Sequence, residues 1–355
     1  MIIYIWNYIS ILLYAKIFKR RTFCMLVSMQ MFLILALRAD SVGVDLTTYK
    51  EAFDYISTLT YTDVLSRIRI LHTALLPHPF DMESGWMILN WLISVLGFNF
   101  RILLVICAAI NMYAIGTLIY RYSRIPWMSF CIIASMNTYF YMFGILRQSL
   151  ALSFVILAIE TYVKGNKIKP FLFWILAFLI HRTALLSIVL FIILKWDCRK
   201  KIMYKCILLG WIPFVASTSI IYSTAISRLM SLFQKAYIGH GAIFNNLMLL
   251  LLLIGVFIWF FFSFHNLSTT METLCIWGTV AGIYWETIGM YNDVLARSIQ
   301  YFLIFVSLSV PMVLSYYPIK KTSWIGSFAI YILLFIYMIY SLRNSILVPY
   351  KIILW

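Results

Sequence analysis

Residues 170–195, PFLFWILAFLIHRTALLSIVLFIILK, form an almost unbroken apolar run with a histidine and an arginine near its centre. A helix that spans a bilayer needs about 20 mainly apolar residues, and the run is long enough. Basic stretches flank it on both sides, KGNKIK at 164–169 and KWDCRKK at 195–201. Because loops rich in Lys and Arg prefer the cytoplasm, one straight crossing would separate the two stretches. The run therefore predicts a hairpin that turns back at His181 and Arg182.

Each arm of this hairpin would be about 18 Å long as a helix, which is less than the ~30 Å hydrocarbon core. The tip would lie below the outer surface, at the floor of a cavity open to the outside, where polar side chains are tolerated. The alternative is one long helix that crosses the membrane with His181 buried and hydrogen-bonded.

The composition of the whole chain is that of an integral membrane protein. Hydrophobic residues make up 64% of its 355 residues and charged residues 11%, whereas about half of a soluble domain is apolar. The sequence predicts an all-α polytopic protein with about 12 transmembrane helices and a short outer re-entrant segment at 86–98. No repeat or linker divides the chain, so we expect a single membrane domain, 1–355, with an outer loop or cap at about 38–85. The candidate apolar segments lie at about 2–15, 22–37, 86–98, 102–120, 126–143, 148–163, 170–180, 183–194, 202–221, 243–264, 271–290, 298–317 and 323–341.

The net charge of +16 is best explained by membrane topology and does not indicate a nucleic-acid partner. Five basic stretches hold sixteen of the 28 Lys and Arg residues and all face the cytoplasm in one arrangement, with the amino terminus outside. The six cysteines show neither CxxC spacing nor a Cys/His pattern typical of zinc. We expect no disulfide and no structural metal.

The same topology places a set of polar residues at the outer ends of apolar segments. Ionisable residues at membrane depth are costly and usually face a cavity or a partner. For each residue alone, the alternative is a side chain that snorkels to the interface; several on one side favour a polar cavity. The set comprises Arg38, Asp45, Tyr49, Glu83, Arg147, Gln148, Asp293 and Arg297.

Two of these positions carry recognisable chemistry. Arg147 follows Gly144 at a predicted helix start, where backbone N–H groups favour anions and a guanidinium fork suits phosphate. Histidine is the residue type whose side chain exchanges protons most readily near neutral pH, which makes His181 a candidate for proton transfer. Glu83 and Asp45 are rival general bases or acceptors for sugar hydroxyls. The spaced acidic pair in DSVGVD has no further ligands and does not predict a metal site.

Five short motifs follow one another along the chain: RADSVGVDLTTY at 38–49, ESGWMIL at 83–89, GILRQSLALS at 144–153, LIHRTALLS at 179–187 and ARSIQYF at 296–302. In this order they resemble the EpsG-like members of the Wzy family, the bacterial O-antigen and exopolysaccharide polymerases. The resemblance extends from residue 38 to about residue 305.

The resemblance implies a fold like that of GT-C-type glycosyltransferases and a polymerase of lipid-linked repeat units. Such an enzyme transfers a growing glycan from undecaprenyl diphosphate to the non-reducing end of an incoming lipid-linked repeat, without a nucleotide sugar or other cofactor. It implies the bacterial inner membrane, with the active site facing the periplasm, and a polysaccharide chain-length regulator as a candidate partner.

Within this reaction, cations must stabilise the departing diphosphate. We expect Arg147 and Arg297 in this role, with Arg38 next. A proton acceptor must serve the acceptor hydroxyl, and His181 is favoured over Glu83 and Asp45. The residues expected to bind substrate are Gln148, Tyr49 and Tyr301.

Two other functions fit a polytopic chain. A flippase or other transporter is one, although no two-fold repeat is visible. A membrane O-acyltransferase with a histidine in a membrane cavity is the other, although an acyl thioester bound from the cytoplasm would not use several outer arginines.

Overall fold

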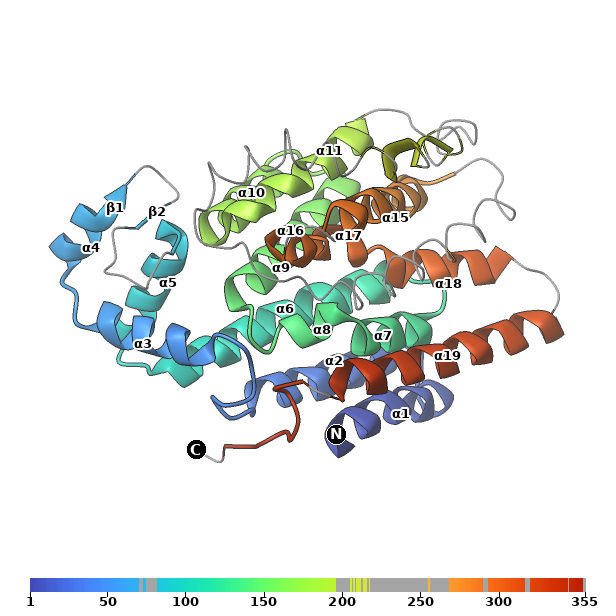
Figure 1. Ribbon diagram of the computed structural model, residues 1–355, viewed down its shortest axis with the longest axis horizontal. Coiled ribbons are helices and arrows are strands. Elements are labelled where there is room, and N and C mark those ends of the chain that lie inside the picture. The colour runs from blue at the N-terminus through green and yellow to red at the C-terminus, as the bar shows by residue number, and fades with distance from the viewer. Residues whose placement is uncertain are drawn as a thin grey trace. The chain divides into compact units, whose positions relative to one another are not determined.

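The computed structural model describes residues 1–69, 73–74, 82–195, 268–289, 293–316, 320–343 and 345–353, together with single positions between 205 and 217 and residue 255. Helices dominate this part of the chain, and the only strands in it, β1 (Ile68–Arg69) and β2 (Thr73–Ala74), form one short antiparallel pair (Figure 1). The all-α class is therefore confirmed. Most of the expected segments 202–221 and 243–264 lie outside the described residues.

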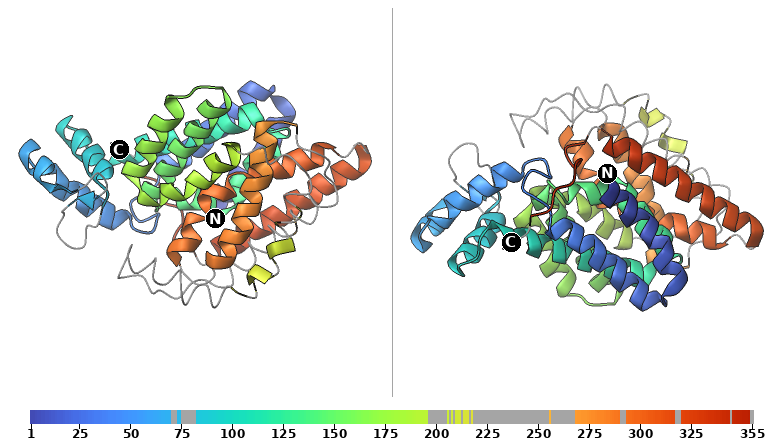
Figure 2. Two further views of the ribbon diagram at one scale, coloured as in Figure 1. Left: turned by 90° about the horizontal axis from the view of Figure 1, so that it is seen from above. Right: turned by 90° about the horizontal axis from the view of Figure 1, so that it is seen from below.

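Contacts divide the chain into two compact units, Met1–Leu185 with Trp324–Trp355, and Leu186–Ser323. The first unit is built on apolar helices that pack against one another. They are α1 (Ile2–Ile17), α2 (Arg20–Ala36), α6 (Phe100–Tyr122), α7 (Pro126–Ser135), α8 (Asn137–Tyr141), α9 (Leu146–Val163), α10 (Lys169–Ile180) and most of α19 (Lys320–Leu342). In Figure 2, α1 and α2 lie side by side at the blue end of the colour scale.

Polar side chains join two of these helices inside the first unit. Ser153 Oγ donates to Asn111 Oδ1 at 2.7 Å, and Asn111 Nδ2 donates to Ser149 Oγ at 3.3 Å. All three residues are buried, and small polar residues at helix contacts are typical of membrane helix pairs. This network fixes α6 against α9, the helix that carries Arg147.

The segment between Arg38 and Glu83 forms helices α3 (Leu46–Ser57) and α4 (Tyr61–Arg67) and the β1–β2 pair, and α5 (Ser84–Val95) follows it. In α3 the buried residues recur at helical spacing, Leu46, Tyr49, Ala52, Phe53 and Ile56, and this face packs against α5. Thr60 and Asp63 form a capping box that starts α4. The position of this segment on the outer side of the membrane stays a prediction.

The long apolar run at 170–195 is interrupted at the expected place. Helix α10 ends at Ile180, His181 is extended, and a 3₁₀ helix, η2 (Arg182–Ser187), leads into α11 (Ile188–Lys195). One uninterrupted helix is therefore wrong. The direction in which α11 continues stays a prediction, because it belongs to the second unit.

In the second unit, α15 (Thr270–Gly289) packs against α11, α16 (Asp293–Ser298), α17 (Gln300–Leu303) and α18 (Val306–Tyr316). Trp285 Nε1 donates to Ser298 Oγ at 2.8 Å and ties α15 to α16. The axis bends by 43° between Ala296–Leu303 and Val306–Tyr316.

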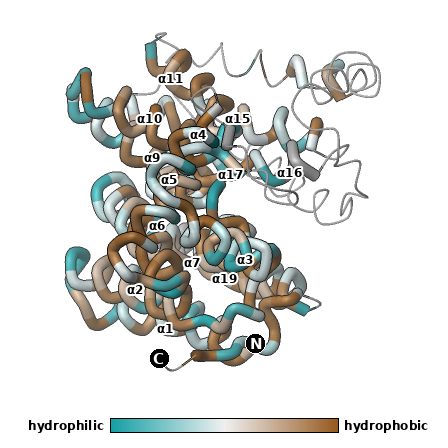
Figure 3. The backbone as a smooth tube through the Cα atoms, turned by 90° about the vertical axis from the view of Figure 1, so that its left-hand side faces the viewer, coloured by the Kyte–Doolittle hydropathy of each residue, from teal (hydrophilic) through white to brown (hydrophobic). Residues whose placement is uncertain are grey.

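Three described helices are long and apolar enough to cross a membrane, Phe100–Tyr122, Leu146–Val163 and Ile325–Leu342, and the bent pair makes up to four. Hydrophobic residues colour most of these helices brown in Figure 3. Other expected crossings are shorter. The 126–143 run is split at Met136, whose extended backbone separates α7 from α8. About twelve crossings and the GT-C-like arrangement stay predictions.

Candidate functional site

Glu83 lies at the centre of a cluster of polar side chains in the first unit. Its side chain is almost completely buried, at 4% exposure. Arg147 Nη1 donates to Glu83 Oε2 at 2.7 Å, and the other oxygen, Oε1, lies 2.7 Å from His181 Nδ1. The backbone N–H of Arg182 also donates to Oε1, at 3.2 Å. Both carboxylate oxygens are therefore engaged.

The surroundings of Glu83 keep it ionised. Burial alone would raise the pKa of this carboxyl, but His181, Arg147 and the backbone N–H of Arg182 together hold the pKa well below its ordinary value. An ionised carboxylate can only accept hydrogen bonds. His181 must therefore donate from Nδ1, which leaves Nε2 as the basic nitrogen of the neutral ring.

Tyr49 completes the cluster on the other side of Arg147. Arg147 Nε donates to the Tyr49 hydroxyl at 3.4 Å, and the guanidinium carbon lies 5.7 Å from the centre of the phenol ring. Trp86 packs edge-on against the same ring with centroids 5.6 Å apart. Burial raises the pKa of Tyr49, so the phenol stays neutral. These contacts hold the guanidinium plane in place.

Four elements bring the cluster together. Tyr49 is on α3, Glu83 precedes α5, Arg147 is the second residue of α9, and His181 follows α10. The pairing of α9 with α10 and of α10 with α5 sets the positions of the last three. The end of α10 therefore faces the starts of α5 and α9.

Two glycines permit the close approaches that this arrangement requires. A Cβ on Gly85 would lie 2.6 Å from the carbonyl oxygen of Leu179, so only glycine lets the start of α5 contact the end of α10. A Cβ on Gly144 would lie 2.6 Å from the backbone nitrogen of Val44. The first contact brings Glu83 to His181, and the second brings the loop before α3 to the start of α9.

Arg38 does not join this cluster. It is 1% exposed, and its guanidinium donates to the carbonyl oxygens of Phe143 at 3.1 Å, Met142 at 3.5 Å and Leu35. It is the buried support of the turn that precedes α9. The expectation that Arg38 binds diphosphate finds no support in these contacts.

The other expected residues of the first unit lie near the cluster in the sequence. Asp45 is exposed and precedes α3 with a left-handed φ of 66°. Its charge acts on Tyr49 one helical turn later. Gln148 follows Arg147 in α9 and is 4% exposed. The roles of Asp45 and Gln148 stay predictions.

Arg297 and Tyr301 belong to the second unit. Tyr301 is completely buried, and Arg297 is partly exposed at the end of α16. Their part in a site with Glu83 stays a prediction.

Two features of the cluster were missed from the sequence. One is the backbone N–H of Arg182, which has no sequence signal because every residue except proline has such a group. The other is Trp86 of the ESGWMIL motif, which was not among the expected site residues. It is fully buried, and its indole N–H has no hydrogen-bond partner among the residues that the structure describes. A buried donor beside Tyr49 could only be found once α3 and α5 are known to pack together.

The arrangement can support proton transfer next to a fixed positive charge. A carboxylate that fixes the Nδ1–H of an imidazole leaves Nε2 oriented as a general base and stabilises the imidazolium that forms. Arg147 adds a fixed positive charge beside it. Among the described residues, no group of three or more His, Cys, Asp or Glu side chains could hold a metal ion.

Comparison with known proteins gives one informative result. Curated proteins and solved structures contain no match to the chain. A family model, the EpsG family, matches residues 21–352, nearly the whole sequence. The apolar helices, the order of the five motifs and this match agree, and the chain therefore belongs to the EpsG family, whose members are membrane proteins of the polysaccharide-polymerase type.

Proposed function

We propose that the protein is a polysaccharide polymerase of the bacterial inner membrane. It would transfer a growing glycan from undecaprenyl diphosphate to the non-reducing end of a lipid-linked repeat unit at the outer, periplasmic face. Membership in the EpsG family supports the class of reaction. The observation that carries the proposal is Glu83, which joins His181 and Arg147 at 2.7 Å each.

In the proposed reaction, the acceptor sugar hydroxyl gives its proton to Nε2 of His181. Its oxygen forms a bond to the anomeric carbon of the donor glycan. The bond from that carbon to the diphosphate oxygen breaks, and undecaprenyl diphosphate leaves with the bonding electrons. Glu83 stabilises the imidazolium, and Arg147 stabilises the negative charge that develops on the leaving group.

In this assignment neither Glu83 nor Asp45 is the general base. Both oxygens of Glu83 already accept hydrogen bonds, and a lowered pKa makes the group a weak base. Glu83 is therefore a positioning residue in the proposal. Asp45, which is exposed, is left as an acceptor for sugar hydroxyls. Arg297 remains a candidate for the diphosphate beside Arg147, and Gln148, Tyr49 and Tyr301 remain candidates for substrate contacts.

Reconstitution distinguishes the polymerase from a transporter and from an O-acyltransferase. Purified protein in liposomes is given lipid-linked repeat units, and the lipid extract is analysed for glycan length by gel and mass spectrometry. The proposal expects glycans of several repeat units, and none from His181→Ala. Movement of unchanged repeat units across the bilayer would indicate a transporter. Acyl groups on the repeat, formed only when an acyl donor is added, would indicate an acyltransferase.

A further inference from the structure

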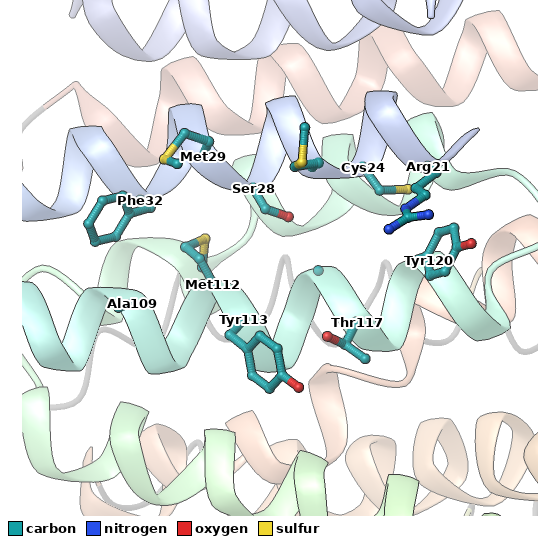
Figure 4. A pocket seen from close by; sticks show the side chains of 12 residues that line it. Arg21, Cys24, Ser28, Met29, Phe32, Ala109, Met112, Tyr113, Thr117 and Tyr120 are labelled. Carbon is teal, nitrogen blue, oxygen red and sulfur yellow. The ribbon is translucent and has the colours of Figure 1, made fainter. Parts of the chain in front are cut away.

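A groove with a volume of about 590 Å³ runs between α2 and α6 in the first unit (Figure 4). It is a different site from the Glu83 cluster, because none of Tyr49, Glu83, Arg147 or His181 lines it. Its walls are mainly apolar and include Met25, Met29, Phe32, Met112 and Tyr113.

Three of the apolar side chains of this groove are largely exposed on the first unit. Met25 is 62% exposed, Met29 53% and Tyr113 64%. Flexible methionine side chains adapt to irregular apolar partners. Because α6 is long and apolar enough to cross a membrane, hydrocarbon is the natural solvent for such a surface.

One end of the groove is cationic. Arg21 and Tyr120 lie together at that end, with the guanidinium directed from α2 toward α6 (Figure 4). The neighbouring Arg20 is occupied, because it donates to the carbonyl oxygens of Tyr120 at 2.6 Å and Ser123 at 2.7 Å, which end α6. No carboxylate lines the groove. The surface therefore offers a positive charge above an apolar channel.

The length of the groove along the axis of α2 matches the thickness of one leaflet. From Arg21 to Phe32, eleven residues of helix rise by about 16 Å, and half of the ~30 Å hydrocarbon core is about 15 Å. The floor is closed where Ser28 meets Gly116, since a Cβ there would lie 2.3 Å from Ser28 Oγ. A single chain of one leaflet fits these dimensions, with its head group level with Arg21.

We propose that this groove binds an anionic phospholipid, with one acyl chain between α2 and α6 and the phosphate at Arg21. The positive end selects a lipid with net negative charge over a zwitterionic lipid. A long polyprenyl chain would exceed the groove, whereas one acyl chain of a leaflet matches it. The inference does not depend on the polymerase activity and is tested without it.

Native mass spectrometry of the full-length protein provides the test. The protein is titrated in detergent with phosphatidylglycerol or phosphatidylcholine, and the bound fraction is read from the mass. We expect phosphatidylglycerol to bind at least fivefold more tightly than phosphatidylcholine. Arg21→Gln should weaken phosphatidylglycerol about tenfold, as for a lost charge-assisted contact. Lys19→Gln, an equal charge change at an exposed neighbour outside the lining, should change it less than twofold.

A second pair of variants tests the apolar part. Thr117→Phe fills the groove and should reduce binding of both lipids, whereas Leu33→Phe, on an exposed part of α2 outside the lining, should not. Thermal unfolding checks that each variant is folded. If Thr117→Phe does not fold, the comparison of Arg21→Gln with Lys19→Gln decides the test. Equal binding of the two lipids, or equal losses from Arg21→Gln and Lys19→Gln, would overturn the proposal. So would displacement of phosphatidylglycerol by an equal or lower concentration of undecaprenyl phosphate.

Discussion

At the scale of single residues, the chemistry of the candidate site depends on a buried carboxylate with three partners. Glu83 accepts from Arg147 and from the backbone of Arg182, and it orients His181. Removing one partner of such a set leaves the others buried and unsatisfied, which costs more than the lost contact itself. Stability and activity are therefore coupled at this residue.

This coupling predicts how stability depends on pH. The pKa of Glu83 is lower in the folded protein than its ordinary value of 4.5. The unfolded chain therefore takes up the proton at higher pH, so the stabilisation is complete above about pH 5 and is lost as the pH falls toward the folded pKa. We expect the thermal midpoint of the wild-type protein in detergent to fall between pH 6 and 4 by more than that of Glu83→Gln. Glu51→Gln, an exposed change on α3, should behave like the wild type. If the thermal midpoints of the wild type and Glu83→Gln fell equally between pH 6 and 4, this would contradict the ionised state of Glu83.

Arg147 is predicted to act through both its charge and its shape. Arg147→Ala should abolish polymer while single repeat units accumulate, because the diphosphate loses its cation. Lysine keeps the charge but lacks the planar fork that contacts Glu83 and Tyr49, so activity should stay at least about tenfold low, equivalent to ~1.4 kcal/mol of transition-state binding.

The measurement for Arg147 is the glycan ladder from a deletion strain that carries each variant at equal membrane abundance. Arg124→Ala and Arg124→Lys, at an exposed position of the basic stretch RYSR at 121–124, are the matched controls and should give normal ladders. A normal ladder from Arg147→Ala would remove the proposed diphosphate contact.

At the scale of elements, the close approach of α5 to α10 positions the site. Gly85→Ala would place a Cβ 2.6 Å from the Leu179 carbonyl oxygen, so the start of α5 must move away and carry Glu83 from His181. We expect a loss of about 1–3 kcal/mol in stability and a shortened or absent ladder. Gly165→Ala is the control, because its φ of +82° makes alanine strained while no atom lies within 4 Å. It should lower the thermal midpoint and leave the ladder unchanged; equal ladders from both variants would contradict the role of Gly85.

The helix break at His181 leads to a prediction about topology. If the chain turns back there, the basic stretches on either side of the run share one face of the membrane. Single cysteines at positions 167 and 200, introduced into a cysteine-free variant, should both resist an impermeant thiol reagent added from outside. A cysteine introduced at position 61 in the expected outer cap is the positive control. Labelling of position 200 without position 167 would show that the chain crosses between them.

The elements show which features can be predicted from sequence. The break at His181 could be predicted because basic stretches flank the run, and α9 (Leu146–Val163) follows the expected segment 148–163 closely. The break at Met136 could not, because apolar residues continue on both sides of it and only the backbone changes. The Glu83–His181 pair is separated by 98 residues. Both residues were expected in one site, but their roles follow from hydrogen bonds that no local pattern encodes.

At the scale of the whole molecule, two arginines expected to serve the same diphosphate have different outcomes. Arg38 is buried among backbone carbonyls and supports the turn before α9, whereas Arg147 contacts the carboxylate of the candidate site. From sequence the two shared one feature, an arginine at the outer end of an apolar segment, and Arg38 was ranked below Arg147 only because Arg147 also lies at an expected helix start. The packing of the chain, which decides how many carbonyls surround each guanidinium, separates a structural cation from one that contacts the candidate site.

This distribution of charges leads to a prediction about divalent metals. Glu83 is occupied by Arg147 and His181, so the cations of the proposed reaction are side chains of the chain itself. The purified protein should therefore elongate lipid-linked repeat units in excess chelator at a rate within about twofold of the rate with Mg²⁺. The reason is that no step of the proposed reaction requires a metal ion. The glycan ladder is measured after chelation, and again after adding Mg²⁺ or Mn²⁺ in excess of the chelator. Activity that disappears with chelator and returns only with the metal would assign Asp45 and Glu83 as ligands. In that case Asp45→Asn should raise the metal concentration needed for half activity, whereas under the present proposal it changes only the KM for the acceptor sugar.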